Sequence, residues 1–201
     1  MTENRPALAV FASGNGSNLQ ALIDGSKTAG WPAEIRVVVS DKKDAFALER
    51  AKNANIEAVW FSPKQYASRE AYDLGLVELL RQRSIDWVIL AGFMRILSPV
   101  FVRPYLGKMI NVHPALLPKY PGTHSIERAF QAGEKEVGVT VHFVDEGVDT
   151  GPIIVQEAIP VQPGETLEQL TGRVHDVEHR IFPEAIRDVI LGRVKFVRNI
   201  G

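Results

Sequence analysis

The strongest indication of the fold is the segment Ala7-Leu8-Ala9-Val10-Phe11-Ala12, followed directly by Ser13-Gly14-Asn15-Gly16-Ser17-Asn18. Its first six residues are apolar without polar alternation, which is typical of a strand buried on both faces of a parallel sheet. The next six are small, polar or glycine, and a helical pattern follows. A buried strand, a glycine-rich turn and a helix in succession predict the first unit of a doubly wound α/β sheet.

The same alternation of apolar runs and helical patterns continues through the first half of the chain. Further strands are expected at Glu34–Ser40, Ala58–Phe61, Asp86–Ala91 and Lys108–Val112. Helices are expected at Asn18–Thr28, at Asp44–Asn53 and after Ser68. Right-handed crossovers join such strands into a Rossmann-like, doubly wound, mostly parallel sheet.

The second half of the chain follows a different pattern. β-rich runs at Val137–Val144 and Pro152–Val161 flank a turn-prone segment, Asp145–Gly151. A last helix is expected to begin with a capping box at Thr166, and Pro183 is expected to kink or end it. The prediction is an α/β fold with an irregular C-terminal half.

Composition narrows the classes of function. The 201 residues are 45% hydrophobic and 23% charged with a net charge of −1, which predicts one domain (1–201) and no nucleic-acid or membrane partner. The absence of cysteine excludes disulfides, thiolate zinc sites and cysteine nucleophiles. No apolar run approaches the roughly 20 residues that span a bilayer. Met1–Pro6 shows no signal-peptide organisation, so a cytoplasmic location is expected.

The first candidate site is the glycine loop 13–18. Glycines bring backbone N–H groups close to a ligand, and a helix N-terminus adds free donors and partial positive charge, so the loop predicts an anion site. A tight turn with Ser17 or Asn18 as helix cap is an equal alternative. Nicotinamide binding, with Asp41 on the ribose, is weaker because Leu19 stands where the dinucleotide fingerprint needs a small residue. No P-loop motif occurs.

The second candidate is Asn111-Val112-His113-Pro114, at the end of an expected strand. Residues two apart in an extended chain project to the same side, so Asn111 and His113 face one space. An amide donor and an imidazole together can hold a developing oxyanion and move a proton. The alternative is that His113 is a buried, hydrogen-bonded histidine without a chemical role.

The third candidate is Asp149, in the turn-prone segment. A carboxylate near His113 would orient the imidazole and favour its charged form. Turns also recruit aspartate for local reasons, so a structural role stays open. A metal site is not expected, because no H-E-x-x-H spacing occurs among the five histidines, His113, His124, His142, His175 and His179.

Four motifs, in order along nearly the whole chain, carry a resemblance to a known family. They are Ser13–Asn18, Ala91-Gly92-Phe93-Met94-Arg95-Ile96-Leu97, Asn111–Gly122 and Asp149-Thr150-Gly151-Pro152. Together they closely resemble the glycinamide ribonucleotide formyltransferases. Asn-x-His-Pro with a later Asp is shared by folate-dependent formyltransferases and deformylases. The glycine loop and Lys-Tyr-Pro-Gly point more narrowly to the enzymes that act on glycinamide ribonucleotide.

The resemblance implies a reaction and a role for each catalytic candidate. The amine of glycinamide ribonucleotide would attack the formyl carbon of 10-formyltetrahydrofolate directly, in de novo purine (IMP) biosynthesis, without a covalent enzyme intermediate or a metal. Asn111 and protonated His113 would stabilise the tetrahedral oxyanion. Asp149 would hold and charge His113 and help to move the proton of the attacking amine.

The resemblance also implies the ligand contacts. The substrate phosphate would lie on Gly16, Ser17 and Asn18, with His175 and Glu178 near the ribose phosphate, although a solvated helix face is the alternative for the last two. The residues implied for binding of the folate co-substrate are Arg69, Met94, Arg95, Ile96, Leu97, Asn111, Asp145, Glu146, Gly147, Val148 and Asp149.

Each of three alternative functions predicts a different sequence feature. Methionyl-tRNA formyltransferase would carry an additional basic C-terminal domain, and formyltetrahydrofolate hydrolase an N-terminal regulatory domain ahead of the first strand. A non-catalytic nucleotide-binding module would explain the glycine loop but leaves Asn111, His113 and Asp149 unused. The expected partners are therefore small-molecule substrates only, with the chain a monomer or a weak homodimer.

Overall fold

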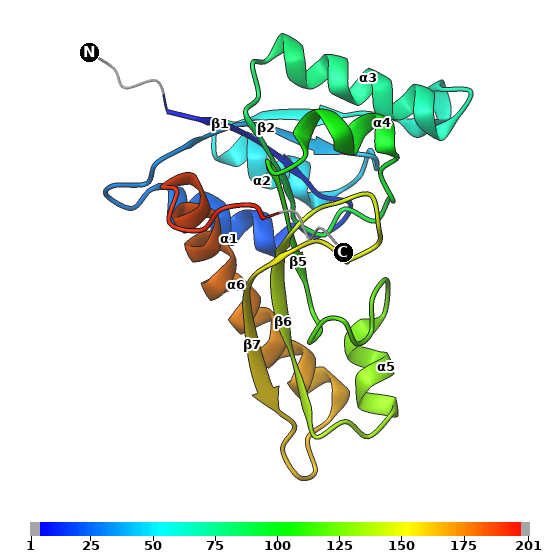
Figure 1. Ribbon diagram of the computed structural model, residues 1–201, viewed down its shortest axis with the longest axis vertical. Helices are drawn as coiled ribbons and strands as arrows, with labels where there is room; N and C mark the ends of the chain where they lie inside the picture. Colours follow the sequence, from blue (N-terminus) through cyan, green and yellow to red (C-terminus); the bar gives the residue numbers. More distant parts are fainter. Residues whose placement is uncertain (1–4, 198–201) are drawn as a thin grey trace.

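The computed structural model describes residues 5–197, which contain one seven-stranded sheet in the order β3-β2-β1-β4-β5-β6-β7 (Figure 1). Residues 1–4, where no signal peptide is expected, and 198–201 lie outside the described part. The strands are β1 (Ala7–Phe11), β2 (Glu34–Ser40), β3 (Glu57–Trp60), β4 (Trp87–Leu90), β5 (Met109–His113), β6 (Glu136–Phe143) and β7 (Ile153–Pro160). The α-helices are α1 (Ser17–Ser26), α2 (Phe46–Asn53), α3 (Arg69–Gln82), α4 (Pro99–Val102), α5 (Ser125–Gln131) and α6 (Leu167–Ile190). Short 3-10 turns lie at Pro63–Gln65 and Arg103–Tyr105.

The first five strands are parallel, as the apolar runs predict. Every expected strand is present, and no strand end differs from its prediction by more than one residue. β1 lies between β2 and β4, so the chain order reverses beside β1. In open α/β sheets, ligands bind at such a reversal, outside the carboxyl ends of the strands.

Both faces of the parallel sheet are covered, which explains why its strands lack polar alternation. Leu8 and Val10 of β1 pack on one side, in a core with α1, α2 and α6. Ala9 and Phe11 pack on the other side, with α3 and α4 (Figure 1). No helix within residues 5–197 is long and apolar enough to cross a membrane.

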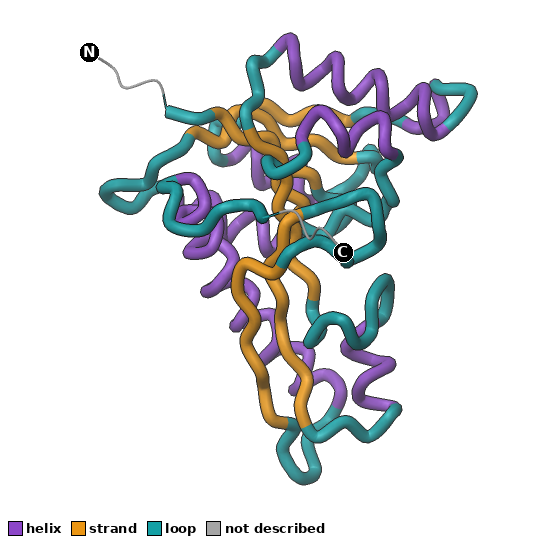
Figure 2. The backbone as a smooth tube through the Cα atoms, viewed as in Figure 1, coloured by secondary structure: helices purple, strands orange, loops and turns teal. Residues whose placement is uncertain are grey.

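The C-terminal half departs from the parallel pattern of the first half, as the sequence predicts, and it does so through antiparallel strands. β6 pairs antiparallel with β5 and with β7, and the two eight-residue strands extend well beyond the parallel strands (Figure 2). A turn can join antiparallel neighbours, whereas parallel neighbours need a crossover. Residues 144–152, which include the turn-prone segment Asp145–Gly151, therefore connect β6 to β7 directly.

The last helix begins as predicted and ends later than predicted. Thr166 accepts from the backbone N–H of Gln169 and the Gln169 side chain accepts from the N–H of Thr166, which completes the capping box. The expectation that Pro183 ends the helix is wrong, because α6 continues to Ile190. Pro183 is buried against Gly25 of α1, where an added Cβ would lie 3.2 Å from the Pro183 Cβ. This packing offsets the backbone hydrogen bond that proline cannot make.

Candidate functional site

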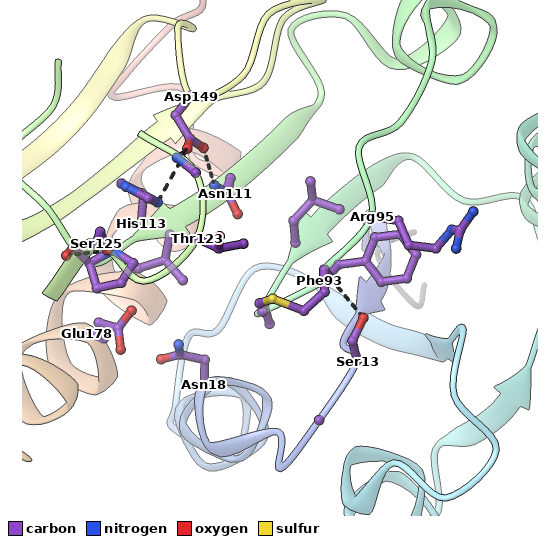
Figure 3. Close-up of a pocket in the computed structure, with 18 of the residues that line it drawn as sticks. Ser13, Asn18, Phe93, Arg95, Asn111, His113, Thr123, Ser125, Asp149 and Glu178 are labelled. Carbon is purple, nitrogen blue, oxygen red and sulfur yellow. Dashed lines mark hydrogen bonds and ion pairs between the residues drawn. The ribbon is translucent and has the colours of Figure 1, made fainter. Parts of the chain in front are cut away.

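A cavity of about 800 Å³ opens at the carboxyl ends of β1, β4 and β5, beside the reversal of strand order. The main segments that line it are the glycine loop 13–18, the segment 90–97 after β4, the end of β5, residues 122–127 at the start of α5, the turn after β6 and one face of α6 (Figure 3). Its volume is in the range of small-molecule sites. The glycine loop and the candidate catalytic residues His113 and Asp149, which are about a hundred or more positions away in the sequence, therefore line the same cavity.

The glycine loop has the conformation that an anion site needs. Gly16 is the N-cap of the ten-residue α1, with φ at 75°, and no side chain caps this end of the helix. The alternative in which Ser17 or Asn18 serves as the cap is therefore wrong. The first turn of α1 carries no acidic residue, and the buried Oδ1 of Asn18 lacks a protein partner. Free backbone donors and the positive end of the helix dipole thus face the cavity.

Helix α2 supports this loop from outside the cavity. The N–H of Ala47 donates to the carbonyl of Gly14 (3.1 Å). Arg50 donates to the backbone oxygen and to the side-chain oxygen of Asn15, both at 2.9 Å. The loop is held from behind, so its backbone is preorganised for a ligand.

The segment after β4 presents apolar side chains at the cavity. Met94 and Ile96 are 61% and 59% exposed. The segment is nevertheless anchored, because the N–H of Met94 donates to the Ser13 hydroxyl (2.9 Å) and the Arg95 guanidinium lies 5.0 Å from the Tyr72 ring centroid. Exposed apolar groups on a fixed backbone suit a flat, largely apolar ligand.

Asn111 and His113 face the same space, as their two-residue spacing predicts, and Asp149 from the turn after β6 lies beside them (Figure 3). Asp149 Oδ2 lies 3.5 Å from His113 Nδ1, and Asp149 Oδ1 lies 3.4 Å from Asn111 Nδ2. Both contacts are longer than an ordinary hydrogen bond, so a substrate atom or a water can interact with these groups. His113 is only 6% exposed, and its Nε2 lies 2.8 Å from the backbone oxygen of Tyr120.

Asp149 is ionised in this setting. Burial raises the pKa of its carboxyl. This rise is outweighed by the lowering effect of the hydrogen bonds from His142 and from the N–H of Gly122, and of the charges of His113 and His142. The net pKa is below the ordinary aspartate value. The carboxylate therefore places a negative charge 3.5 Å from Nδ1 of His113.

His142 belongs to the same cluster, and sequence reasoning missed its role. It is opposite Asn111 in the antiparallel β5–β6 pairing and is 2% exposed. Its Nδ1 donates to the backbone oxygen of Phe143 (2.8 Å), while its Nε2 lies 3.1 Å from Asn111 Nδ2 and 3.6 Å from Asp149 Oδ1. The strand pattern predicts that residue 142 lies in a strand, but no local signal gives the register that places it against Asn111.

His175 and Glu178 lie together on the face of α6 that lines the cavity. His175 Nδ1 is 2.5 Å from Glu178 Oε2, and Glu178 is 2% exposed. A solvated helix face is therefore wrong for Glu178. The Glu178 hydrogen bond raises the pKa of His175, burial opposes it, and the charges of Glu178 and Asp176 add to the rise. The pair thus brings a readily protonated imidazole to the cavity wall.

The raised pKa of His175 predicts a pH-dependent contribution to stability. The charged ring stabilises the fold, so its contribution is complete below the unfolded value of about 6.5 and is lost as pH rises through the higher folded pKa. We expect His175→Gln, which keeps a donor without a titrating group, to reduce the free energy of unfolding most below about pH 6.5. Urea denaturation of both proteins across this range measures the difference. A difference that grows with rising pH would contradict the assignment.

Two residues implied for folate binding do not line the cavity. Arg69 starts α3 and pairs with Glu70 at 3.5 Å. Glu146 pairs with Arg103 at 2.7 Å, while its neighbours Asp145 and Gly147 do line the cavity. Within residues 5–197, no group of three or more His, Cys, Asp or Glu side chains is arranged to hold a metal ion.

Comparison with known proteins gives the family. The model of the family described as formyl transferase matches residues 7–186, nearly the whole described chain. The chain belongs to the formyl transferase family. The phosphoribosylglycinamide formyltransferase of Escherichia coli (strain K12) is 46% identical over 192 residues, covering 96% of this chain and 91% of that protein. A crystal structure of glycinamide ribonucleotide transformylase 1 from Symbiobacterium toebii superposes with a TM-score of 0.94 at 42% identity, covering 98% and 93% of the two chains.

Other relatives of this formyl transferase are much longer. The trifunctional purine biosynthetic protein adenosine-3 of Drosophila melanogaster is 48% identical over 194 residues. That match covers 96% of this chain, and the chain spans 14% of the length of that relative. The α/β, mostly parallel fold expected from the sequence is the fold of these formyl transferases.

Proposed function

We propose that this formyl transferase moves the formyl group of 10-formyltetrahydrofolate to the amine of glycinamide ribonucleotide, as a step of purine biosynthesis. The observation that carries the proposal is that an anion-binding helix end and the cluster of Asn111, His113 and Asp149 face one cavity. The names of the relatives from Escherichia coli and Symbiobacterium toebii support the same acceptor. The proposal treats residues 1–201 as a single formyltransferase domain, cytoplasmic, monomeric or weakly dimeric, acting on small molecules.

The acceptor has matching groups at the α1 side of the cavity. A phosphate accepts from the free backbone donors at Gly16, Ser17 and Asn18, and a protonated His175 adds positive charge nearby. The buried carboxylate of Glu178 can accept from ribose hydroxyls. This arrangement leaves the acceptor amine directed toward the end of β5.

The folate that carries the formyl group would bind on the opposite side of the cavity, between the segment after β4 and the turn after β6. Met94, Ile96 and Val148 supply exposed apolar groups for a flat ring system, and all three line the cavity. The rest of that wall is formed by Arg95, Leu97, Asp145 and Gly147. Arg69 and Glu146 lie outside the cavity lining, so we leave them out of the proposed folate contacts.

The chemistry follows from the three clustered side chains. The amine nitrogen bonds to the formyl carbon and the carbonyl oxygen becomes an oxyanion. The amide hydrogen of Asn111 and the charge of His113 stabilise that oxyanion, which is absent from the ground state. Asp149 stabilises positive charge on His113 as the oxyanion forms, and it accepts the amine proton, directly or through water. The oxyanion then collapses to a carbonyl as the carbon–nitrogen bond to the folate breaks. The folate nitrogen takes up the proton held by Asp149, which regenerates the carboxylate, and formylated acceptor and tetrahydrofolate leave.

An assay of the purified protein tests this function. With 10-formyltetrahydrofolate, glycinamide ribonucleotide and no added metal, we expect formylated acceptor and tetrahydrofolate in equal amounts. The matched control omits the acceptor. Formate released at the same rate in that control would instead establish a hydrolase, and an unchanged donor in both reactions would exclude catalysis by this chain.

A further inference from the structure

The loop segment Tyr120–Gly122 contacts both His113 and Asp149 through its backbone. The carbonyl oxygen of Tyr120 is 2.8 Å from His113 Nε2, and the N–H of Gly122 donates to Asp149 Oδ2 at 2.8 Å. A carbonyl oxygen can only accept, so Nε2 of His113 carries a hydrogen. In the neutral ring, Nδ1 is then the unprotonated nitrogen, and it faces Asp149. The position of this segment therefore decides which nitrogen of His113 gains a proton.

The segment has a backbone conformation that its surroundings must maintain. It belongs to no helix or strand and lies between β5 and α5. Tyr120 has φ at 53° and Gly122 has φ at 78°. Positive φ is natural for glycine but unfavourable for tyrosine, so it persists only where neighbouring groups hold it.

Arg128 of α5 is one of the groups that hold it. Its Nη1 donates to the carbonyls of Pro121 (2.8 Å) and Thr123 (3.0 Å). Its guanidinium carbon lies 5.5 Å from the ring centroid of Tyr120, in a cation–π contact. Arg128 does not line the cavity, so its link to His113 runs through the segment.

Glu134 holds the other end of the Tyr120 side chain. The Tyr120 hydroxyl donates to Glu134 Oε1 at 2.9 Å, and Lys119 Nζ lies 3.1 Å from the same oxygen. These two hydrogen bonds lower the pKa of Glu134, so it is a carboxylate at neutral pH. Glu134 also lies outside the cavity lining.

We propose that Arg128 and Glu134 are positioning residues, which hold Tyr120–Gly122 so that its backbone fixes the proton on His113 Nε2 and the orientation of Asp149. Neither side chain touches a substrate in this proposal. The expected effect of the segment on turnover rests on the proposed function, whereas its expected effect on the protonation of His113 does not.

The kinetic test uses Arg128→Ala beside a matched arginine. Arg36 also donates from Nη1 to two backbone carbonyls, those of Arg83 (2.9 Å) and Ser84 (3.2 Å), but lies in β2 outside the cavity lining. We expect Arg128→Ala to lower kcat about 10-fold with both KM values within about 2-fold, because the loss is one of positioning. Arg36→Ala should leave kcat unchanged.

Conservative variants at Glu134 separate positioning from simple packing. Glu134→Gln keeps an oxygen that accepts from the Tyr120 hydroxyl, whereas Glu134→Ala removes it. We expect Glu134→Ala to lower kcat and Glu134→Gln to restore most of it. Equal kcat values in Arg128→Ala and Arg36→Ala, or a loss confined to KM, would overturn the proposal.

A spectroscopic test needs no substrate. In ¹⁵N NMR of the ligand-free protein, at a pH where the His113 ring is neutral, the wild type should show the Nε2–H tautomer. His113→Ala identifies the signals among the five histidines. Arg128→Ala should show a mixture of tautomers, and an unchanged tautomer would overturn the proposal. A wild type that transfers no formyl group would refute the proposed function alone, since the tautomer is measured separately.

Discussion

Replacing His113 with alanine is expected to lower kcat by about 100- to 1000-fold, the usual effect of losing one oxyanion-stabilising donor. The charge of the ring acts most strongly on the oxyanion, which exists only near the transition state. Turnover should therefore fall more than substrate binding. Asp149→Asn should be comparably severe, because asparagine keeps the shape of the side chain and a carbonyl for Gly122 but lacks the charge that favours imidazolium.

The three residues are expected to act as a unit, which gives a sharper test. The double variant Asn111→Ala/His113→Ala should be little slower than its slower single variant, because groups that act together are non-additive. Turnover of all four variants over a range of pH measures this, with circular dichroism to establish that each is folded. A folded His113→Ala protein with near-full turnover would refute the assignment of the chemistry to this cluster.

Replacing Gly16 with valine is expected to weaken acceptor binding about 10- to 100-fold, because a non-glycine residue at positive φ costs about 1–3 kcal/mol and each 1.4 kcal/mol changes Kd tenfold. A valine side chain would obstruct the close approach of a phosphate to the backbone of the loop. It would also disturb the loop itself. A Cβ on Gly16 would lie 2.8 Å from the Cβ and 2.9 Å from the Cα of Ala47, and φ at 75° is unfavourable for valine. The loop and the end of α1 must therefore move.

Binding of the folate should remain largely intact in this variant, because its proposed contacts lie on other segments. Direct titration with each ligand separates the two effects. Gly16→Ala provides a milder form of the same change, and Gly172→Ala is the matched control, since Gly172 lies in α6 outside this cavity with no atom within 4 Å of an added Cβ. Equal loss of both ligands in Gly16→Val would indicate a damaged fold instead.

Local sequence patterns predict most of the helices and strands correctly, because the burial and capping of one element determine which residue types occur along it. The unbroken apolar run in β1 reflects a strand covered on both faces, and the capping box at Thr166 satisfies its own helix end. The convergence of Asn111 and His113 also follows from local geometry, because alternate residues of a strand share a face. Helix α5 and the short α4 were not predicted, since their few turns leave little periodicity.

The order of elements, the glycine loop at the end of the first strand and the two side chains on one face of β5 all follow from local sequence. The partners that come from distant segments depend instead on how the elements pack together. The register of β6 brings His142 to Asn111, the left-handed loop at Tyr120 holds His113, and packing against Gly25 lets α6 run through Pro183. Each of these depends on a contact between residues far apart in the chain, and such contacts form only once the layers of the fold have assembled.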